Sequence, residues 1–218
     1  MRKRVSSLRL LLLCIASCMV LCVAGCGARQ KTIEFREHLD DTVLELDGEK
    51  YMLRELAFYV AYEEMVIQEQ ALVYDPGDPN AYWNTHMNGH FMRLWAREEA
   101  MNQAIHDFIF YGLAQELGME LTQEEIDYAK GRGEDFWMDL GEQGQQGIGI
   151  SAEELTEDVL RIALAQKCQQ LYAQMDDLSE EDYDVGGIAY EELLKEHTYK
   201  IKTGVWEGIS MGHVTLEQ

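Results

Sequence analysis

The chain has 218 residues and is strongly acidic, with 40 Asp and Glu residues against 18 Lys and Arg and a formal net charge of −22. This charge argues against nucleic-acid binding and against electrostatic attraction to an anionic bilayer, because both present phosphate charges. The length suits one domain, or a domain with a small appendage, that has a core of its own. Only two prolines occur, Pro76 and Pro79, and good helix formers are abundant, so the composition favours a mainly helical protein.

The first 26 residues have the features of an export signal. A basic start is followed by an apolar run from Leu10 to Val23, and then by Val23-Ala24-Gly25-Cys26. The apolar run of about 14 residues is shorter than the roughly 20 that a membrane span needs. Its ending fits the lipobox of bacterial lipoproteins, in which the cysteine thiol takes the lipid. The sequence therefore predicts a lipoprotein signal peptide over residues 1–25 and a lipidation site at Cys26, rather than a plain signal peptide or an uncleaved anchor.

Lipidation sets the expected location of the mature chain. We expect it to begin at Cys26 on the extracytoplasmic face of the bacterial cell membrane, held by acyl chains, since two or more chains anchor a protein stably. The signal contains four basic and no acidic residues, so its removal changes the formal charge from −22 to −26 (−22 − 4). Such an acidic body is expected to contact the membrane through the lipid on Cys26.

The cysteines leave no pair for an intramolecular disulfide in the mature chain. Cys14, Cys18 and Cys22 lie in the signal, Cys26 takes the lipid, and Cys168 remains alone. An exported protein without disulfides depends on core packing. Cys168 falls in a helical pattern and is expected to be a small buried apolar side chain rather than a nucleophile.

The mature chain is expected to begin with a polar tether, residues 26–40, followed by one helical domain, residues 41–218. A small β-hairpin should open this domain, because the short apolar strand Thr42–Leu46 precedes Asp47-Gly48. Asp-Gly tolerates the positive φ angles of a two-residue hairpin turn. The fold class is therefore mainly α, with a β-hairpin near the N-terminus and a short strand near the C-terminus.

Helical periodicity divides most of the domain into helices. Two of the starts are marked by the capping-box spacing of Thr122 with Glu125 and of Ser151 with Glu154. The expected elements are helices over about 53–73, 91–117, 122–140, 151–175 and 188–197, and a possible strand over 199–203.

The sequence also predicts local features at three glycine positions or runs and at one acidic run. Gly112 is expected to permit a close helix crossing, and the run Gly131 to Gly133 to kink its helix. The glycine-rich run 141–149 is expected to be a flexible loop, and the acidic run 176–184 a solvated spacer.

No motif for a cofactor or a metal emerges from the sequence. His86 and His90 have i, i+4 spacing, but Gly89 interrupts the segment and no third ligand stands at a suitable spacing. The glycine-rich run 141–149 has no lysine and no preceding strand, so it is not a phosphate-binding loop. We expect no catalytic residue, no metal site and no cofactor.

The order of several motifs resembles a known family. The strand with Asp47-Gly48-Glu49-Lys50 precedes a long helix and Tyr82-Trp83, and the run 114–119, Ala-Gln-Glu-Leu-Gly-Met, leads to 121–126, Leu-Thr-Gln-Glu-Glu-Ile. This order resembles the N-terminal chaperone region of PrsA- and SurA-type foldases over residues 42–175, with the tail from Ile188 completing that domain. The resemblance implies a helical chaperone-like domain over residues 41–218.

The chain departs from the family where its activity resides. Family members usually carry a parvulin prolyl-isomerase domain between the last long helix and the C-terminal segment, whereas here only the short acidic run stands at that place. The resemblance therefore implies a holdase-like module without an isomerase core, and no family catalytic residue has a position in this chain.

The sequence leads to one main functional expectation and two alternatives. The main one is a lipid-anchored module that binds unfolded or exported polypeptides through exposed aromatic and methionine side chains, which adapt to varied partners. The alternatives are an accessory envelope lipoprotein with one dedicated partner, and a peptidyl-prolyl isomerase. The candidate peptide-binding residues are Tyr82, Trp83, Met87, Phe91, Met92 and Trp95.

Overall fold

The computed structural model describes residues 32–87 and 90–216, so the signal peptide and Cys26 lie outside the described residues. The compact unit that contains the described residues spans Thr32–Gln218. Its elements in chain order are η1 (Phe35–His38), β1 (Thr42–Leu46), β2 (Glu49–Met52), η2 (Leu53–Leu56), α2 (Ala57–Tyr74), α3 (Pro79–Trp83), β3 (His86–Met87), β4 (His90–Phe91), α4 (Met92–Glu116), α5 (Gln123–Asp139), α6 (Gly141–Ile148), α7 (Ala152–Asp176), η3 (Glu180–Tyr183), α8 (Ile188–Leu194), β5 (Tyr199–Ile201) and α9 (Thr203–Trp206).

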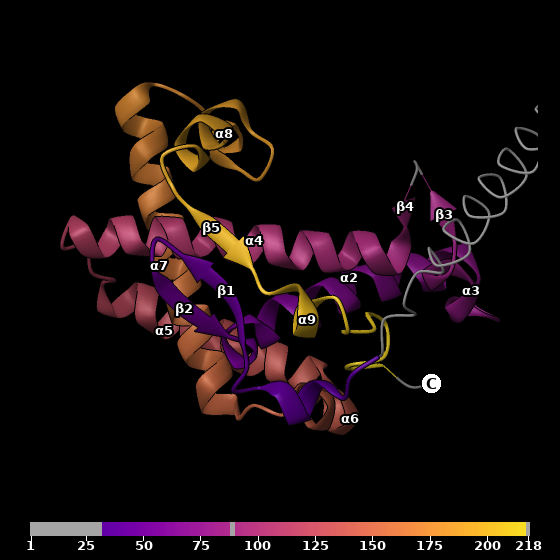
Figure 1. The fold of residues 1–218 in the computed structure, drawn as a ribbon. Coiled ribbons are helices and arrows are strands. Elements are labelled where there is room, and N and C mark those ends of the chain that lie inside the picture. Colours follow the sequence, from indigo (N-terminus) through magenta and orange to yellow (C-terminus); the bar gives the residue numbers. More distant parts are fainter. Residues whose placement is uncertain (1–31, 88–89, 217–218) are drawn as a thin grey trace, which may run out of the picture. The chain divides into compact units, whose positions relative to one another are not determined.

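The expected hairpin and C-terminal strand are confirmed, and they form one sheet. β1 pairs antiparallel with β2 on one side and with β5 on the other (Figure 1), giving the order β2-β1-β5. Asp47 and Gly48 have φ angles of 50° and 89°, as the two-residue turn requires. Strand β5, near the C-terminus, therefore pairs with β1 from the start of the domain.

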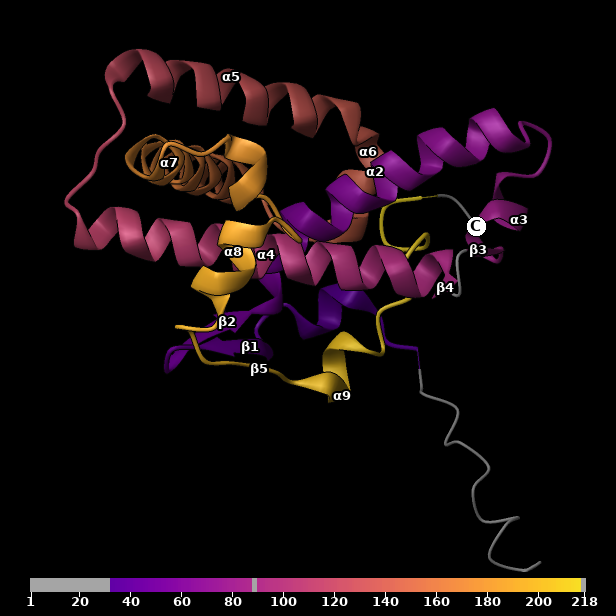
Figure 2. The ribbon, with the colours of Figure 1, turned by 90° about the horizontal axis from the view of Figure 1, so that it is seen from above.

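The long helices pack in succession on one side of this sheet. Viewed as in Figure 2, α4 lies between the sheet and α7, and α5 covers the far side of α7. The ring of Tyr51 on β2 stacks on Phe108 of α4, with 4.1 Å between ring centroids. Since α4 also packs against α2 and carries many of the core side chains, the core is centred on this helix. The expected mainly helical class is confirmed.

Three local expectations differ from the structure because neighbouring segments decide the conformation. The run 141–149 contains helix α6, with Gly149 as its left-handed C-cap, rather than a flexible loop. Helix α5 runs unbroken through Gly131. A Cβ at Gly112 would meet nothing within 4 Å, whereas one at Gly133 would lie 3.3 Å from the Thr156 Cα. The close helix crossing therefore occurs between α5 and α7.

The folded body also begins earlier than expected. Residues 32–40 were assigned to the tether, yet they include η1, and Phe35 is buried in the core. The amide of Ile33 donates to the Gly208 carbonyl at 3.0 Å, so this entry segment lies against the C-terminal part of the chain. Among the described residues, no helix combines the length and apolarity that crossing a bilayer would require.

A buried carboxylate on α2 holds the C-terminal segment. Glu64 is fully buried, and its Oε1 accepts hydrogen bonds from the amides of residues 212–214 at 2.5–3.2 Å. Its Oε2 accepts from both the amide and the hydroxyl of Thr215, each at 2.6 Å. Burial raises the pKa of Glu64, while these hydrogen bonds oppose the rise. The segment supplies donors that a buried carboxylate needs in place of water.

Two arginines of α4 bind the same segment through its carbonyl groups. Arg93 donates to the carbonyl of Met211, and its guanidinium also lies 5.6 Å from the ring centroid of Trp83. Arg97 donates to the carbonyls of Glu207 and Ile209. Residues 207–215 are therefore held from both sides, by a carboxylate of α2 and by guanidinium groups of α4.

Replacing Glu64 by Gln should destabilise the domain by about 2–4 kcal/mol, because one acceptor oxygen becomes an amide that faces N–H donors. Urea denaturation followed by circular dichroism measures this change. Glu69→Gln, at an exposed position of the same helix, should change the stability by less than about 0.5 kcal/mol. Equal effects of the two substitutions would contradict the role given to Glu64.

Gly147→Ala should cost about 1–3 kcal/mol by overpacking, because its Cβ would lie 1.8 Å from the Val214 carbonyl oxygen. Gly131→Ala is the matched change in α5, where a Cβ meets nothing within 4 Å. It should stabilise the protein by about 0.5–1 kcal/mol, since alanine loses less backbone entropy in a helix. Thermal unfolding of both variants tests the pair, and equal shifts would argue against the contact between α6 and the C-terminal segment.

Candidate functional site

Three of the residues expected to form a binding surface are buried instead. Tyr82, Trp83 and Met92 have exposed fractions of 7%, 1% and 7%. The Tyr82 hydroxyl donates to Gln70 Oε1 at 3.0 Å, and the Trp83 indole donates to Gln68 Oε1 at 2.9 Å. These side chains attach α3 and the start of α4 to α2, so the expected exposed surface is wrong for them.

The other three expected residues lie on or beside the β3–β4 hairpin. Phe91 is 51% exposed and packs edge-on against His86, with 5.0 Å between ring centroids. Trp95 is partly buried against the core, and Met87 lies in β3. Phe91 and Trp95 line neither of the two cavities described below.

The larger of these cavities, called here the aromatic groove, has a volume of about 620 Å³. Helices α2 and α5 form its walls, and α4 and α7 form its floor. This volume falls in the range of small-molecule and peptide side-chain sites. It is lined by Phe58, Tyr59 and Tyr62 of α2, Gln103 and Asp107 of α4, Leu121, Glu125, Tyr128, Ala129, Arg132 and Phe136 at or in α5, and Val159, Ile162, Ala163, Gln166, Lys167 and Gln170 of α7.

The aromatic side chains of the groove come from both walls. Phe58 of α2 meets Phe136 of α5 at 4.9 Å and stacks near Tyr62 at 6.0 Å, measured between ring centroids. Tyr62 is 45% exposed and Tyr128 is 69% exposed. The groove thus offers apolar ring faces that solvent can reach, which is the kind of surface that binds apolar side chains of a partner.

Most charges in the groove are paired. Lys167 of α7 lies 2.7 Å from Glu125, and its hydrogen bond together with the Thr122 amide holds the pKa of Glu125 at about 2. The same Glu125 completes the capping box predicted for α5. Arg132 is exposed and has no ion pair among the described residues. The groove itself therefore carries one unpaired cation, although the chain as a whole is acidic.

The buried floor residue Asp107 is paired with its neighbour His106. The His106 Nε2 donates to the Tyr183 carbonyl at 2.9 Å, and its Nδ1 lies 2.8 Å from Asp107 Oδ1. The two contacts tie α4 to the segment that contains η3.

Two half-buried carboxylates, Glu63 of α2 and Glu99 of α4, lie outside the lining of the groove. Burial and the charge of Glu99 raise the pKa of Glu63 to about 7. Burial, followed by the charge of Glu98, also raises the pKa of Glu99. Neither Glu63 nor Glu99 has a cationic partner among the described residues.

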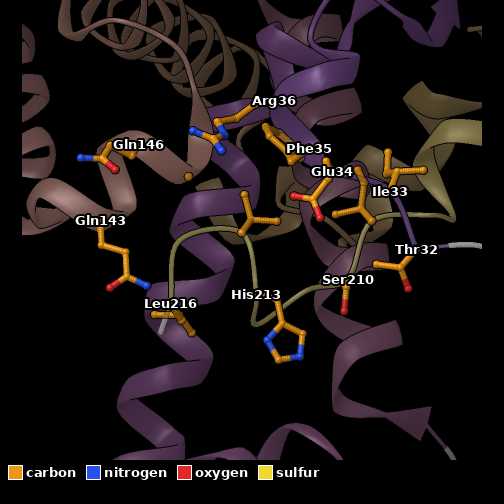
Figure 3. A pocket seen from close by; sticks show the side chains of 13 residues that line it. Thr32, Ile33, Glu34, Phe35, Arg36, Gln143, Gln146, Ser210, His213 and Leu216 are labelled. Carbon is orange, nitrogen blue, oxygen red and sulfur yellow. The ribbon is translucent and has the colours of Figure 1, made fainter. Parts of the chain in front are cut away.

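A second, smaller cavity of about 320 Å³ lies where the entry segment meets the C-terminal segment. Figure 3 shows Gln143 and Gln146 of α6 on one side, Thr32 and Glu34 opposite them, and the loop with His213 between them. The buried His213 Nδ1 has no hydrogen-bond partner in the described part of the chain, and burial lowers the pKa of this side chain. This cavity lacks the exposed aromatic faces of the groove.

The described residues contain no cluster of three or more His, Cys, Asp or Glu side chains that could hold a metal ion. Cys168 is fully buried, as expected, and burial raises the pKa of its thiol to about 11. A thiol with this pKa is protonated near neutral pH, which is unfavourable for a nucleophile. The groove offers apolar, aromatic and charged contacts.

A signal for the groove was present in the sequence of α5. Tyr128, Arg132 and Phe136 recur every four residues in an otherwise polar helix, and only Ala129 and Gly133 of this helix are buried. This pattern places large side chains beside a narrow packing stripe rather than within it. Aromatic residues that flank a stripe of small residues were the feature that could have located the groove.

The domain should lose stability between about pH 4.5 and pH 7 through Glu63. Its carboxyl group is protonated in both folded and unfolded states below this range, whereas at higher pH the folded state must hold a half-buried charge. The stability gain from Glu63→Gln should therefore grow by roughly 1–2 kcal/mol from pH 5 to pH 8. Urea titrations at both pH values test this, with Glu69→Gln as the control. A pH-independent difference for Glu63→Gln would contradict the burial of this charge.

Comparison with known proteins adds no relative from which a function could be transferred. No protein-family model, curated protein or solved structure matches the chain. The aromatic groove is therefore interpreted from its own geometry, as a solvent-accessible apolar channel bordered by charged groups.

Proposed function

We propose that this protein is a membrane-anchored extracytoplasmic lipoprotein that binds apolar segments of unfolded or exported polypeptides in the aromatic groove. Lipid on Cys26 would hold the domain at the membrane surface, and the groove would shield exposed apolar segments from aggregation. The mode of action is that of a holdase, with no covalent chemistry.

The groove is the observation that carries this proposal. Its two walls present partly exposed rings, with Tyr62 on α2 and Tyr128 on α5. The groove-lining positions within α5 span from 125 to 136, which is about 16 Å along a helix axis. A channel of this length accommodates an extended segment of roughly five residues. Aromatic rings add contact area with little loss of side-chain entropy on binding.

The order of elements supports a relation to the chaperone region of PrsA- and SurA-type foldases. The β1–β2 hairpin leads into α2, the Thr122 capping box opens α5, and β5 returns to pair with β1. This return of the tail from Ile188 agrees with a domain whose N- and C-terminal parts complete one another. We propose this relation on the order and pairing of the elements.

The test uses the fragment 27–218, because the compact unit and the core residues of the described chain lie in Thr32–Gln218. Several unrelated chemically denatured clients are diluted into the fragment, and aggregation is followed by light scattering. Scattering should fall as the fragment approaches molar equivalence. The double variant Tyr62→Ser/Tyr128→Ser should need a roughly fivefold higher concentration for half-suppression, which corresponds to about 1 kcal/mol.

The matched control is Val73→Ser/Ile188→Ser, which removes two apolar side chains that are 86% and 78% exposed outside the groove. It should act like the unmodified fragment. Unchanged scattering at molar excess for every client would refute the holdase function. Capture of one client alone would instead favour an accessory lipoprotein with a dedicated partner, and accelerated prolyl isomerisation would favour an enzyme.

A further inference from the structure

We propose that the outer face of the β2-β1-β5 sheet turns toward the membrane, where three lysines contact anionic lipid headgroups. These residues, Lys50, Lys200 and Lys202, are called here the lysine face. The inference rests on the membrane anchoring in the proposed function, and it specifies which side of the anchored domain meets the lipid. The partner of this face is the surface of the same bilayer that holds the chain.

The pairing register of the sheet brings the three lysines together. Glu45 of β1 stands directly opposite Lys50 of β2 and Lys200 of β5. Residues that stand directly opposite each other in antiparallel strands point to the same face. Lys202 follows Lys200 by two positions, and its Nζ lies 2.8 Å from Glu45 Oε2, so it belongs to the same face. Three ammonium groups therefore surround one carboxylate, which gives this row a net charge of +2 (3 − 1).

The long helices pack on the opposite face of the sheet. The side chains that alternate with Glu45 along β1, Leu44 and Leu46, are buried, and Tyr51 of β2 stacks on a ring of α4. In Figure 2, helices α4, α7 and α5 all lie on this one side of the sheet. Lys50 and Lys200 are exposed, and neither forms an ion pair within the described part of the chain. Their charges are therefore open to an anionic partner.

The point at which the described chain begins favours the same side. The Ile33 amide donates to the Gly208 carbonyl at 3.0 Å, and Gly208 follows α9, which packs against β1. Residues 27–31 separate Cys26 from Thr32, so the Cα atoms of these two residues lie at most about 22 Å apart in any conformation. A lipid on Cys26 therefore holds the domain to the bilayer from the end of the chain that lies beside the sheet.

Screening allows the lysine face to approach an anionic surface although the chain has a formal net charge of −22. The Debye length is about 10 Å at 0.1 M salt, so only charges near the bilayer contribute strongly. Packed helices lie about 8–10 Å apart, and α5 is separated from the sheet by α4 and α7. The carboxylates of α5 are therefore screened from the headgroups, whereas the lysine face is attracted to them.

This orientation has a consequence for the aromatic groove. Helix α5, which forms one wall of the groove, lies on the far side of α7 from α4 and the sheet (Figure 2). With the lysine face on the bilayer, α5 and its exposed Tyr128 are directed away from the lipid. The groove then stays open to polypeptides in the surrounding solution.

The experiment anchors the chain 26–218 to vesicles through Cys26 and a maleimide lipid. Cys168 does not compete for the maleimide, because it is fully buried and its thiol pKa is raised to about 11. The vesicles contain phosphatidylcholine alone, or phosphatidylcholine with an equal amount of phosphatidylglycerol. Lysines are acetylated briefly, and mass spectrometry compares Lys50 and Lys200 with the exposed Lys130 of α5. Relative acetylation of Lys50 and Lys200 should fall roughly threefold on the anionic vesicles, and high salt should abolish the difference.

The decisive variant is Lys200→Glu, and its control is Lys195→Glu. Both change the net charge by the same amount, but Lys195 lies at the end of α8, with its side chain 65% exposed, and is not part of the lysine face. Lys50 reports on both variants. Its protection on anionic vesicles should disappear in Lys200→Glu, because the row across the sheet loses its net positive charge, and should persist in Lys195→Glu. Circular dichroism verifies that both variants are folded.

The outcomes separate this inference from the holdase function. Equal relative acetylation of Lys50 on the two kinds of vesicle, or protection of Lys130 in its place, overturns the orientation. Protection that Lys195→Glu removes as fully as Lys200→Glu assigns the effect to net charge and overturns the role of the lysine face. If Lys50 is protected while client aggregation is unchanged, the holdase function fails and the orientation stands. Suppressed aggregation without protection of Lys50 gives the reverse result.

Discussion

The hydrogen bonds that Glu64 accepts from residues 212–215 are the interaction on which the architecture depends most. A carboxylate buried in an apolar interior is costly unless donors replace its lost water, and here four backbone amides and one hydroxyl do so. The same segment lies against α6, where Gly147 leaves room for the Val214 carbonyl, and is held by Arg93 and Arg97 of α4. The C-terminal segment, which contains no regular secondary structure after α9, thus contacts α2, α4 and α6 and joins them.

The groove results from the packing of α7 against both α4 and α5, with α2 on the other side of the groove. Helix α7 packs against both α4 and α5, and α5 follows it closely at Gly133. Its larger residues Tyr128 and Phe136 line the groove beside this stripe, and Phe136 also packs against the core. Phe58 of α2 contacts Phe136 across the groove, with 4.9 Å between ring centroids. A packing stripe of small residues with aromatic flanks is thus sufficient to produce a channel between helices that are each well packed elsewhere.

The sequence predicted those elements that local chemistry determines. The Asp47-Gly48 turn, the boxes at Thr122 and Ser151 and the long helices are confirmed within a few residues, because turn geometry and capping involve near neighbours. The position of the groove and the fate of Tyr82 and Trp83 depend on contacts between distant segments. Gln70 accepts a hydrogen bond from the Tyr82 hydroxyl, and Gln68 accepts one from the Trp83 indole N–H. Sequence periodicity does not reveal such partners. Helix α6 was missed because its glycines weaken the helical pattern that tertiary contacts restore.

The hydrogen bonds of Glu64 join it to residues 212–215, which follow it by 148 to 151 positions in the sequence. This separation affects how the chain acquires its structure. A ribosome delivers α2 long before it delivers the segment that supplies the carboxylate with donors, and β1 likewise waits for β5. Until then Glu64 keeps its hydration, which opposes the burial of α2 against α4. Contacts of this high sequence separation must close large loops before they contribute, so they delay completion of the core until synthesis is nearly finished.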